Sequence, residues 1–221
     1  MLINITNGEE FNDYIQNKIE GLFISFNEAL IDGQPIFPLF DESFIKERCF
    51  THHVDKNLYM EKMGPFLNAI SSLTKEDELV LWFGKDMFCQ INLLGLLSYL
   101  ESLKIKNKIY VNIIDDYSKE LIKKEIPILL EGFIDSYVAL FEKRIFIQTN
   151  FEQINNGIKS YLHLFFEDNE IIDFIRENKL VLDRKKLISE VFKRTREYGL
   201  GNVQVINLVN KIIGESSEKG S

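Results

Sequence analysis

"ELVLWFGKDMFCQINLLGLL", residues 78–97, is the stretch of sequence that decides the fold. Six residues typical of a buried β-strand are followed by Gly84, by the charged pair Lys85-Asp86 and then by an almost wholly apolar helical run. A strand that leads directly into a helix is typical of α/β proteins, which place their chemistry where strands end. The stretch therefore predicts a strand at 78–83, a helix at 86–103 and a candidate site between them.

Strands and helices alternate through the first half of the chain. Strand-like runs occupy residues 2–6, 22–26, 78–83 and 109–114, and helical patterns lie between them. This alternation implies parallel pairing with right-handed crossovers, and the apolar strands suit a sheet covered on both faces. Asp41 or Ser43 and Asp55 are candidate N-caps of two helices, the second of which Gly64-Pro65 should kink or break. We predict a Rossmann-like α/β domain over residues 1–117.

The second half of the chain shows helical periodicity and little else. Helices are predicted at 154–166, 170–177, 183–197 and 202–213, whereas residues 137–147 fit either a helix end or a strand. We therefore predict a helical C-terminal domain over 118–214, followed by a polar tail, 215–221, that is expected to be mobile.

Composition and charge exclude several classes of protein. The 221 residues are 45% hydrophobic, which is enough for a sizeable core, and the net charge of −8 argues against a general nucleic-acid or anionic-membrane binder. Neither a transmembrane run nor an ordinary signal peptide is apparent. The two cysteines, Cys49 and Cys89, stand in no metal-ligand spacing. We expect a reduced, cytoplasmic protein without a metal site, and the sequence leaves homo-oligomerisation open.

Polar residues follow each of the four predicted strands. Because the carboxyl ends of parallel strands meet at one edge of a sheet, these residues should converge there. The groups are Asn7-Gly8-Glu9, Asn27-Glu28, Gly84-Lys85-Asp86 and Asp115-Asp116. The glycines would allow close backbone approach, and the following helix N-termini would offer N–H groups to an anion. Neither glycine lies in a dinucleotide or P-loop motif, so the cofactor and the ligand stay unidentified.

Each candidate residue also has a structural interpretation. N-capping alone would explain Asp86 about as well as a ligand would, and Gln90 lies one turn later on the same helix face. Trp82 fits a core position better than a ligand platform. Lys85 could meet a phosphate, although exposed lysines usually bind nothing specific. Glu28 follows a buried strand and is, with Asp86, a candidate general acid or base.

Four motifs together resemble the bacterial domain-of-unknown-function family 1835. They are "INITNGEEF", "FISFNEALIDGQPI", "ERCF" and "VLWFGKDMFCQINLL", in the family's order and spacing across roughly residues 1–115. The C-terminal stretch "KRTREYGLGNVQVINLVNKI" is more loosely similar to the helical region that often accompanies the family. The resemblance implies the positions of site residues and no particular reaction.

The resemblance implies site residues one by one. The matched positions are Asn7, Gly8, Glu28, Asp32-Gly33 with Pro35, Arg48, Trp82, Phe83, Asp86 and Gln90. Glu28 stands where the family has Asp, and Glu9 also departs from an Asp. Gly84-Lys85 stands where the family has Glu-His, so this chain lacks the histidine.

Two functions remain open from the sequence. In the first, the sheet edge binds or processes a small polar, nucleotide-like ligand: Arg48 and Lys85 meet anionic groups, and Glu28 and Asp86 orient them or transfer protons. This hypothesis places Asp86, Glu28 and Arg48 within one pocket, close enough for their side chains to share a ligand or a hydrogen-bond network. In the second, the C-terminal helices bind DNA or a protein, because residues 176–196 hold eight Lys or Arg against three Asp or Glu. However, the stretch 202–213 offers only Lys211 among the basic residues that DNA reading usually needs.

Overall fold

A five-stranded sheet forms the centre of the computed structural model, which describes residues 1–218 and the side chains up to residue 214. The strands lie in the order β2-β1-β3-β4-β5. Their bounds are β1 (Leu2–Asn7), β2 (Leu22–Phe26), β3 (Glu78–Gly84), β4 (Lys108–Ile114) and β5 (Leu121–Pro127). The first four pair in parallel, which confirms the predicted architecture.

The fifth strand corrects the prediction that little but helix follows residue 118. β5 pairs antiparallel with β4 at the edge of the sheet, and its side chains are mostly exposed. Its sequence, "LIKKEIP", lacks the apolar run that marks the other strands, so its conformation depends on pairing with β4. The pairing is irregular, and the buried Asn112 side chain accepts a hydrogen bond from the Glu125 N–H at 2.6 Å. The predicted domain boundary at 117 therefore falls inside the sheet.

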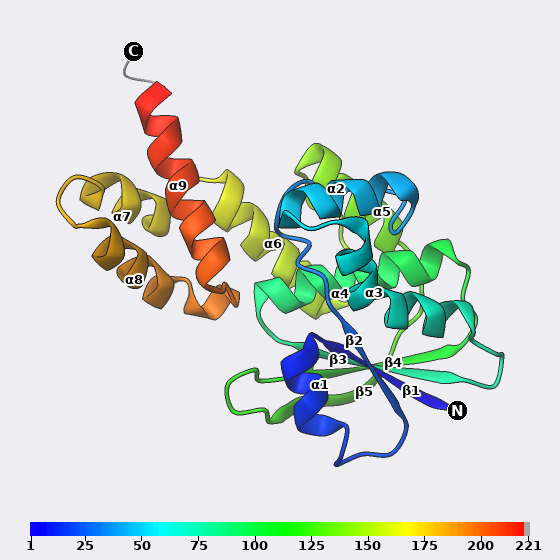
Figure 1. The fold of residues 1–221 in the computed structure, drawn as a ribbon. Helices are drawn as coiled ribbons and strands as arrows, with labels where there is room; N and C mark the ends of the chain where they lie inside the picture. The colour runs from blue at the N-terminus through cyan, green and yellow to red at the C-terminus, as the bar shows by residue number, and fades with distance from the viewer. Residues whose placement is uncertain (219–221) are drawn as a thin grey trace.

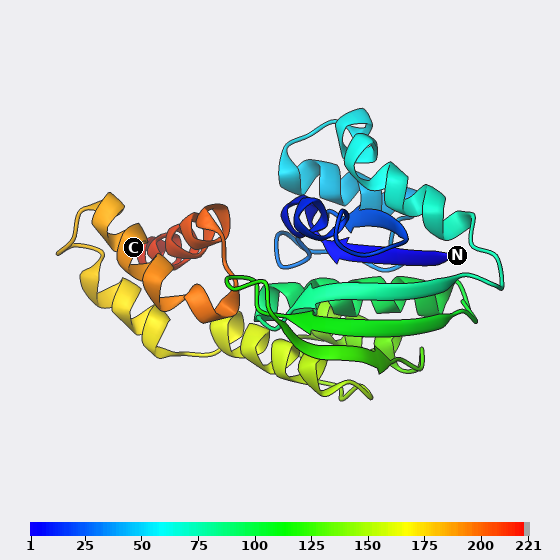
Figure 2. The ribbon, with the colours of Figure 1, turned by 90° about the horizontal axis from the view of Figure 1, so that it is seen from below.

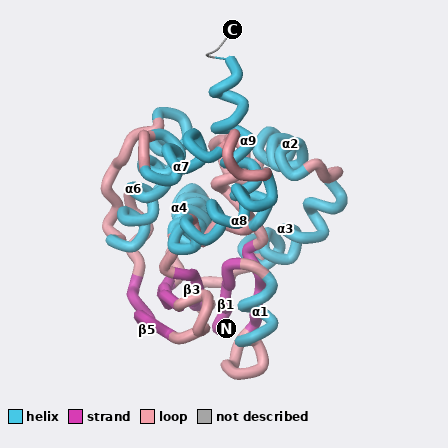
Figure 3. The backbone as a smooth tube through the Cα atoms, turned by 90° about the vertical axis from the view of Figure 1, so that its left-hand side faces the viewer, coloured by secondary structure: helices cyan, strands magenta, loops and turns pink. Residues whose placement is uncertain are grey.

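The two faces of the sheet are covered unequally. One face carries α2 (Glu42–His52), α3 (Lys56–Ser71), α4 (Met87–Ser102), α5 (Phe133–Val138) and α6 (Glu152–Phe166), whereas α1 (Glu9–Ile15) lies on the other (Figures 1 and 3). Side chains alternate along β3, so that Leu81 and Phe83 join the main core while Trp82 packs with Phe11 of α1. Among the described residues, the second face is thus covered only in part, contrary to the expectation of two covered faces.

Capping explains where three helices begin. Asp41, Asp55 and Asp86 each accept a hydrogen bond from the backbone N–H three residues later, as predicted for N-caps. The expected break at Gly64-Pro65 does not occur, and α3 continues through it. Pro65 lies on the exposed side of α3, where the carbonyl that loses its N–H partner is close to solvent.

The C-terminal region is helical, as predicted. A π-helical turn (Ala139–Lys143) extends α5, and after α6 the chain forms α7 (Glu170–Asn178), α8 (Arg184–Arg194), the 3-10 turn η2 (Arg196–Tyr198) and α9 (Asn202–Glu218). Figure 2 shows α7, α8 and α9 as a lobe beside the carboxyl ends of the parallel strands. The expected tail, 215–221, overlaps the end of α9, and 219–221 lie outside the described residues. Within the described chain, every helix is too short or too polar to cross a membrane.

Candidate functional site

Glu28 and Arg48 form a buried ion pair behind the end of β2. The Arg48 Nε donates to Glu28 Oε2 at 3.0 Å, and neither side chain is accessible to solvent. Tyr59 donates its hydroxyl to the other Glu28 oxygen. Burial, together with the Glu28 charge, raises the pKa of Tyr59 well above its usual value, so the phenol stays protonated. The pair is thus satisfied within the protein.

The Arg48 guanidinium also holds the loop that follows β2. Its Nη1 donates to the carbonyl of Asp32 at 2.6 Å, and its Nη2 donates to the carbonyl of Ala29 at 2.9 Å. The same Nη2 contacts His52 Nε2 at 2.8 Å. Every nitrogen of the Arg48 guanidinium is therefore engaged within the protein. Its geometry is that of a positioning residue, which fixes the loop that carries Asp32.

Asp86, Cys89 and Asp116 form a second polar centre, between β3 and α4. Cys89 donates its backbone N–H to Asp86 Oδ1 at 2.9 Å, and its thiol donates to Asp116 Oδ2 at 3.1 Å. One side-chain donor atom from each of the three residues lies within 4.8 Å of the others, so they are the described side chains most suited to hold a metal ion. Gly84 permits this packing, because a Cβ there would lie 2.1 Å from the Asp116 carboxylate.

The surroundings of Asp86 and Cys89 favour the protonated, neutral forms of both side chains. Burial, and then the hydrogen bond and charge of Asp116, raise the pKa of Asp86 to about 8. Burial also raises the pKa of the Cys89 thiol well above its usual value, which makes a nucleophilic role unfavourable. The Asp86 carboxyl is therefore largely protonated at neutral pH and can donate a hydrogen bond or store a proton.

Asn7 and Asn92 join the two centres. The Asn7 Nδ2 donates to Cys89 Sγ at 3.0 Å, and Asn7 Oδ1 accepts from Asn92 at 2.9 Å. Asn92 also donates to the carbonyl of Glu28 at 2.6 Å and accepts from the Leu30 N–H. A continuous chain of hydrogen bonds thus leads from Asp86 to the loop held by Arg48. This chain passes through the Cys89 backbone and reaches Glu28 at its main-chain carbonyl, so it connects the Asp86 side chain to the Glu28–Arg48 pair only indirectly.

The other predicted site residues lie around these centres. Trp82 is buried on the α1 face, where its Nε1 donates to Asn4 Oδ1 at 3.0 Å. Gln90 is buried beside α6 and donates to the carbonyl of Gly84 at 2.6 Å. Lys85 is exposed and pairs with Asp115 at 2.6 Å.

Gly8 lies at the start of α1 with a φ of 88°. A side chain at this position would meet no atom within 4 Å, although the positive φ would strain it.

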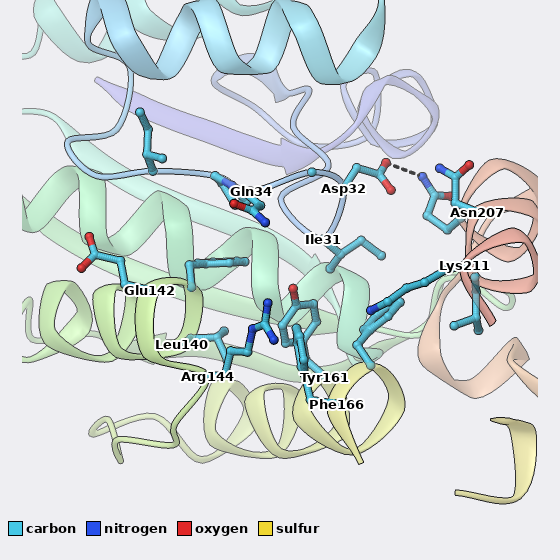
Figure 4. A pocket seen from close by; sticks show the side chains of 17 residues that line it. Ile31, Asp32, Gln34, Leu140, Glu142, Arg144, Tyr161, Phe166, Asn207 and Lys211 are labelled. Atoms are coloured by element: carbon cyan, nitrogen blue, oxygen red, sulfur yellow. Dashed lines mark hydrogen bonds between the residues drawn. The ribbon is translucent and has the colours of Figure 1, made fainter. Parts of the chain in front are cut away.

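A cavity of about 550 Å³ opens on the far side of the Arg48-held loop, between that loop, α6 and α9 (Figure 4). Its walls include the loop around Asp32 and Gly33, two residues that the family resemblance singled out. Gln204 of α9 donates to Asp32 Oδ2 at 2.7 Å and so ties the C-terminal lobe to the loop. The cavity is thus built from segments about 170 residues apart in sequence.

Two cations and a phenol face this cavity. The guanidinium carbon of Arg144 lies 4.6 Å from the centre of the Phe166 ring, and Lys211 Nζ lies 5.4 Å from the same centre. Neither cation forms an ion pair with any carboxylate of the described residues. The Tyr161 hydroxyl points into the cavity (Figure 4), and the hydrogen bonds found within the described part of the chain include none from it. Burial raises its pKa to about 12, so it is a hydrogen-bond donor at neutral pH.

Most residues of this cavity carry no recognisable signal in the sequence. Arg144 lies in residues 137–147, whose sequence fits either a helix end or a strand. Tyr161 lies in the helix predicted at 154–166, where nothing in the pattern distinguishes it from its neighbours. Lys211 could have been singled out, because it is the single basic residue of 202–213. Asn92 was also missed: an amide in an otherwise apolar helix run is a signal that a buried polar group needs satisfying.

Comparison of the chain with protein-family models, curated proteins and solved structures found no match. The resemblance to domain-of-unknown-function family 1835 accordingly rests on the sequence motifs alone.

Proposed function

We propose that the protein binds a small anionic, nucleotide-like ligand in the cavity between the Asp32 loop, α6 and α9. The observation that carries the proposal is the convergence of Arg144, Lys211 and the Tyr161 hydroxyl on one hollow. All three are donors without a carboxylate partner among the described residues, and donors of this kind suit phosphate or carboxylate oxygens.

The shape and lining of the cavity support a ligand with a ring as well as an anion. A volume of about 550 Å³ falls within the range of small-molecule sites. A base could stack on Phe141 or Phe165, whereas the Phe166 ring is already contacted by the two cations. The amides of Gln34 and Asn207 could bond the edge of the base.

The cations are not needed to cap the neighbouring helix. Arg144 and Lys211 lie near the C-terminus of α6, where positive charge is generally favourable. However, Asn169 already donates to the carbonyls of His163 and Glu167 at 2.8 and 3.1 Å. This capping weakens a purely structural explanation for two additional cations.

The proposed ligand lies between the Asp32 loop, α6 and α9, and not at the ends of the parallel strands as the sequence suggested. Glu28 and Arg48 then act indirectly, by holding the loop that presents Asp32. Asp86 acts indirectly as well, through the packing of the C-terminal lobe that carries Lys211.

The alternative of DNA binding through the C-terminal helices receives less support. The supposed recognition helix, α9, buries Val205, Leu208 and Val209 in the core. Several of the basic residues around α8 are engaged: Lys193 pairs with Glu190, and Arg194 stacks over Phe174.

Calorimetric titration with AMP, adenosine and inorganic phosphate tests the proposal. AMP should bind more tightly than adenosine, and Arg144→Met or Lys211→Met should each weaken AMP binding roughly ten-fold or more, the effect of a lost charge-assisted hydrogen bond of about 1.5–3 kcal/mol. Lys185→Met is the matched control, because Lys185 is an exposed lysine outside the cavity. Equal binding of AMP by the wild type and both cavity variants would contradict the proposal.

A further inference from the structure

A second hollow adjoins the cavity along Phe166. This groove, of about 280 Å³, shares Arg144, Phe165, Phe166 and Lys211 with the cavity and continues to Ile172 and Arg176 of α7. Two hollows with four lining residues in common form one extended surface. A ligand seated at Arg144 and Lys211 could therefore continue past Phe166 toward α7.

Arg176 lies at the far end of this surface with part of its guanidinium unused. Its Nη1 makes both contacts with protein, to Asp168 at 2.7 Å and to Asp173 at 3.5 Å. Its Nε and Nη2 donate to no acceptor in the described part of the chain, and the side chain is 43% exposed. Asp168 thus fixes the orientation of the guanidinium and leaves an edge for a second anion.

The groove is not uniformly basic. Glu167 and Asp168 also line it, and Asp168 pairs with Arg176, so an anion at Arg176 could approach only the edge of the guanidinium that Asp168 leaves unused. This arrangement fits two separate anionic groups better than one continuous run of phosphates. Phe166 lines both hollows, and because its ring already lies under Arg144 and Lys211, the part of the ligand that joins the two phosphates would pass along the edge of the ring.

We propose that the ligand is a nucleotide with a second, separate phosphate, which binds one phosphate at Arg144 and Lys211 and the other at Arg176. The inference rests on the proposed function of the cavity and specifies its ligand class. It assigns Arg176 a binding role, which the ion pair with Asp168 does not explain.

Titration with three probes tests this inference. Adenosine 3′,5′-bisphosphate should bind roughly ten-fold more tightly than AMP, the gain from one further charge-assisted contact. ADP, which has two phosphates in one chain, should gain less. Arg176→Gln should reduce the affinity for the bisphosphate to that for AMP and leave AMP binding unchanged. Lys185→Gln should change neither affinity, and thermal unfolding should show that both variants fold.

The outcomes separate this inference from the proposed function. If AMP binds and Arg176→Gln leaves the bisphosphate affinity unchanged, or weakens AMP equally, the second phosphate position is overturned while the cavity function stands. If ADP binds as tightly as the bisphosphate, the separation of the phosphates is overturned. If none of the probes binds, both proposals fail together.

Discussion

The backbone of Gly199 lies directly against the carboxyl group of Asp86. A Cβ built at residue 199 would stand 2.1 Å from Asp86 Oδ1 and 2.4 Å from its Cγ. Gly199 ends η2 in the C-terminal lobe, whereas Asp86 caps α4 beside the sheet. The lobe therefore meets the sheet edge at a contact that leaves no room for a side chain.

Gly199→Ala should destabilise the protein more than Gly132→Ala. Both glycines have a positive φ, 73° and 81°, so both alanines carry a backbone cost of about 1 kcal/mol. At residue 132 the new methyl group meets nothing within 4 Å, whereas at 199 it collides with a carboxyl group held by Cys89. Urea unfolding of the two variants measures the difference, and equal losses would show that the lobe yields easily at this contact.

The stability of the protein should respond to the ionisation of Asp86. Its folded pKa of about 8 exceeds the ordinary value of 3.8, so between those values the unfolded chain releases a proton that the folded protein keeps. The Asp86 contribution to the unfolding free energy should fall as pH rises from about 4 to 8 and level off above. Asp86→Asn retains the cap and removes this titration. As pH rises across that range, the unfolding free energy of Asp86→Asn should increase by more than about 1 kcal/mol relative to that of the wild type.

Asp115→Asn provides a control whose contribution should not vary across that pH range. The hydrogen bond from Lys85 holds the pKa of Asp115 well below its usual value. Its contribution is therefore present above the unfolded pKa and lost only as the solution becomes acidic. Thermal unfolding of both variants between pH 4 and 9 would contradict the Asp86 assignment if their differences from wild type followed the same trend.

Arg48→Met should be strongly destabilising. It removes one partner of a buried ion pair and leaves the Glu28 charge and two loop carbonyls unpaired, at a cost of about 3–5 kcal/mol. The double variant Glu28→Gln with Arg48→Met should recover part of the loss, because no buried charge is then left alone. Lys62→Met is the matched control: Lys62 pairs with Glu9 in solvent, and its loss should have little effect on urea unfolding. A small effect of Arg48→Met alone on the unfolding free energy would contradict the role of Arg48 in holding the loop after β2.

Asn92→Asp should cost about 2 kcal/mol or more at neutral pH, because a carboxylate cannot donate to Asn7 Oδ1 and the Glu28 carbonyl. Asn107→Asp is the comparison, since Asn107 also donates to two carbonyls but lies nearer to solvent. Its loss should be smaller. Thermal unfolding of the two variants at pH 7 and pH 4 checks this, and the Asn92→Asp deficit should shrink in acid as the new carboxyl regains a proton.

The sequence was a good guide to the sheet and a partial guide to the site. The four parallel strands could be predicted because each is a short apolar run between helical patterns. β5 could not, since its conformation depends on pairing with β4 and its side chains face solvent. The strand ends did carry interacting polar groups, yet the pairing of Glu28 with Arg48 is a long-range contact that no local pattern specifies.

The cavity was beyond prediction for a related reason. Its lining comes one or two side chains at a time from segments whose pattern is that of ordinary amphipathic helix or loop. Packing of α6 and α9 is what brings the side chains of Arg144, Tyr161 and Lys211 to the same cavity. The alternation along β3, by contrast, places Trp82 and Phe83 on opposite faces of the sheet, and Trp82 is buried against Phe11 in the smaller core.

The position of β1 between β2 and β3 has a consequence for the order in which the chain can fold. During synthesis, β1 can pair with β2 soon after Leu22–Phe26 has emerged, but its other edge must wait for Glu78–Gly84. Until then, an apolar strand edge is open to other nascent chains, which makes this interval the one most prone to aggregation. Expression at lower temperature, or with chaperones that hold nascent chains, should therefore raise the soluble yield more than stabilising the finished sheet would.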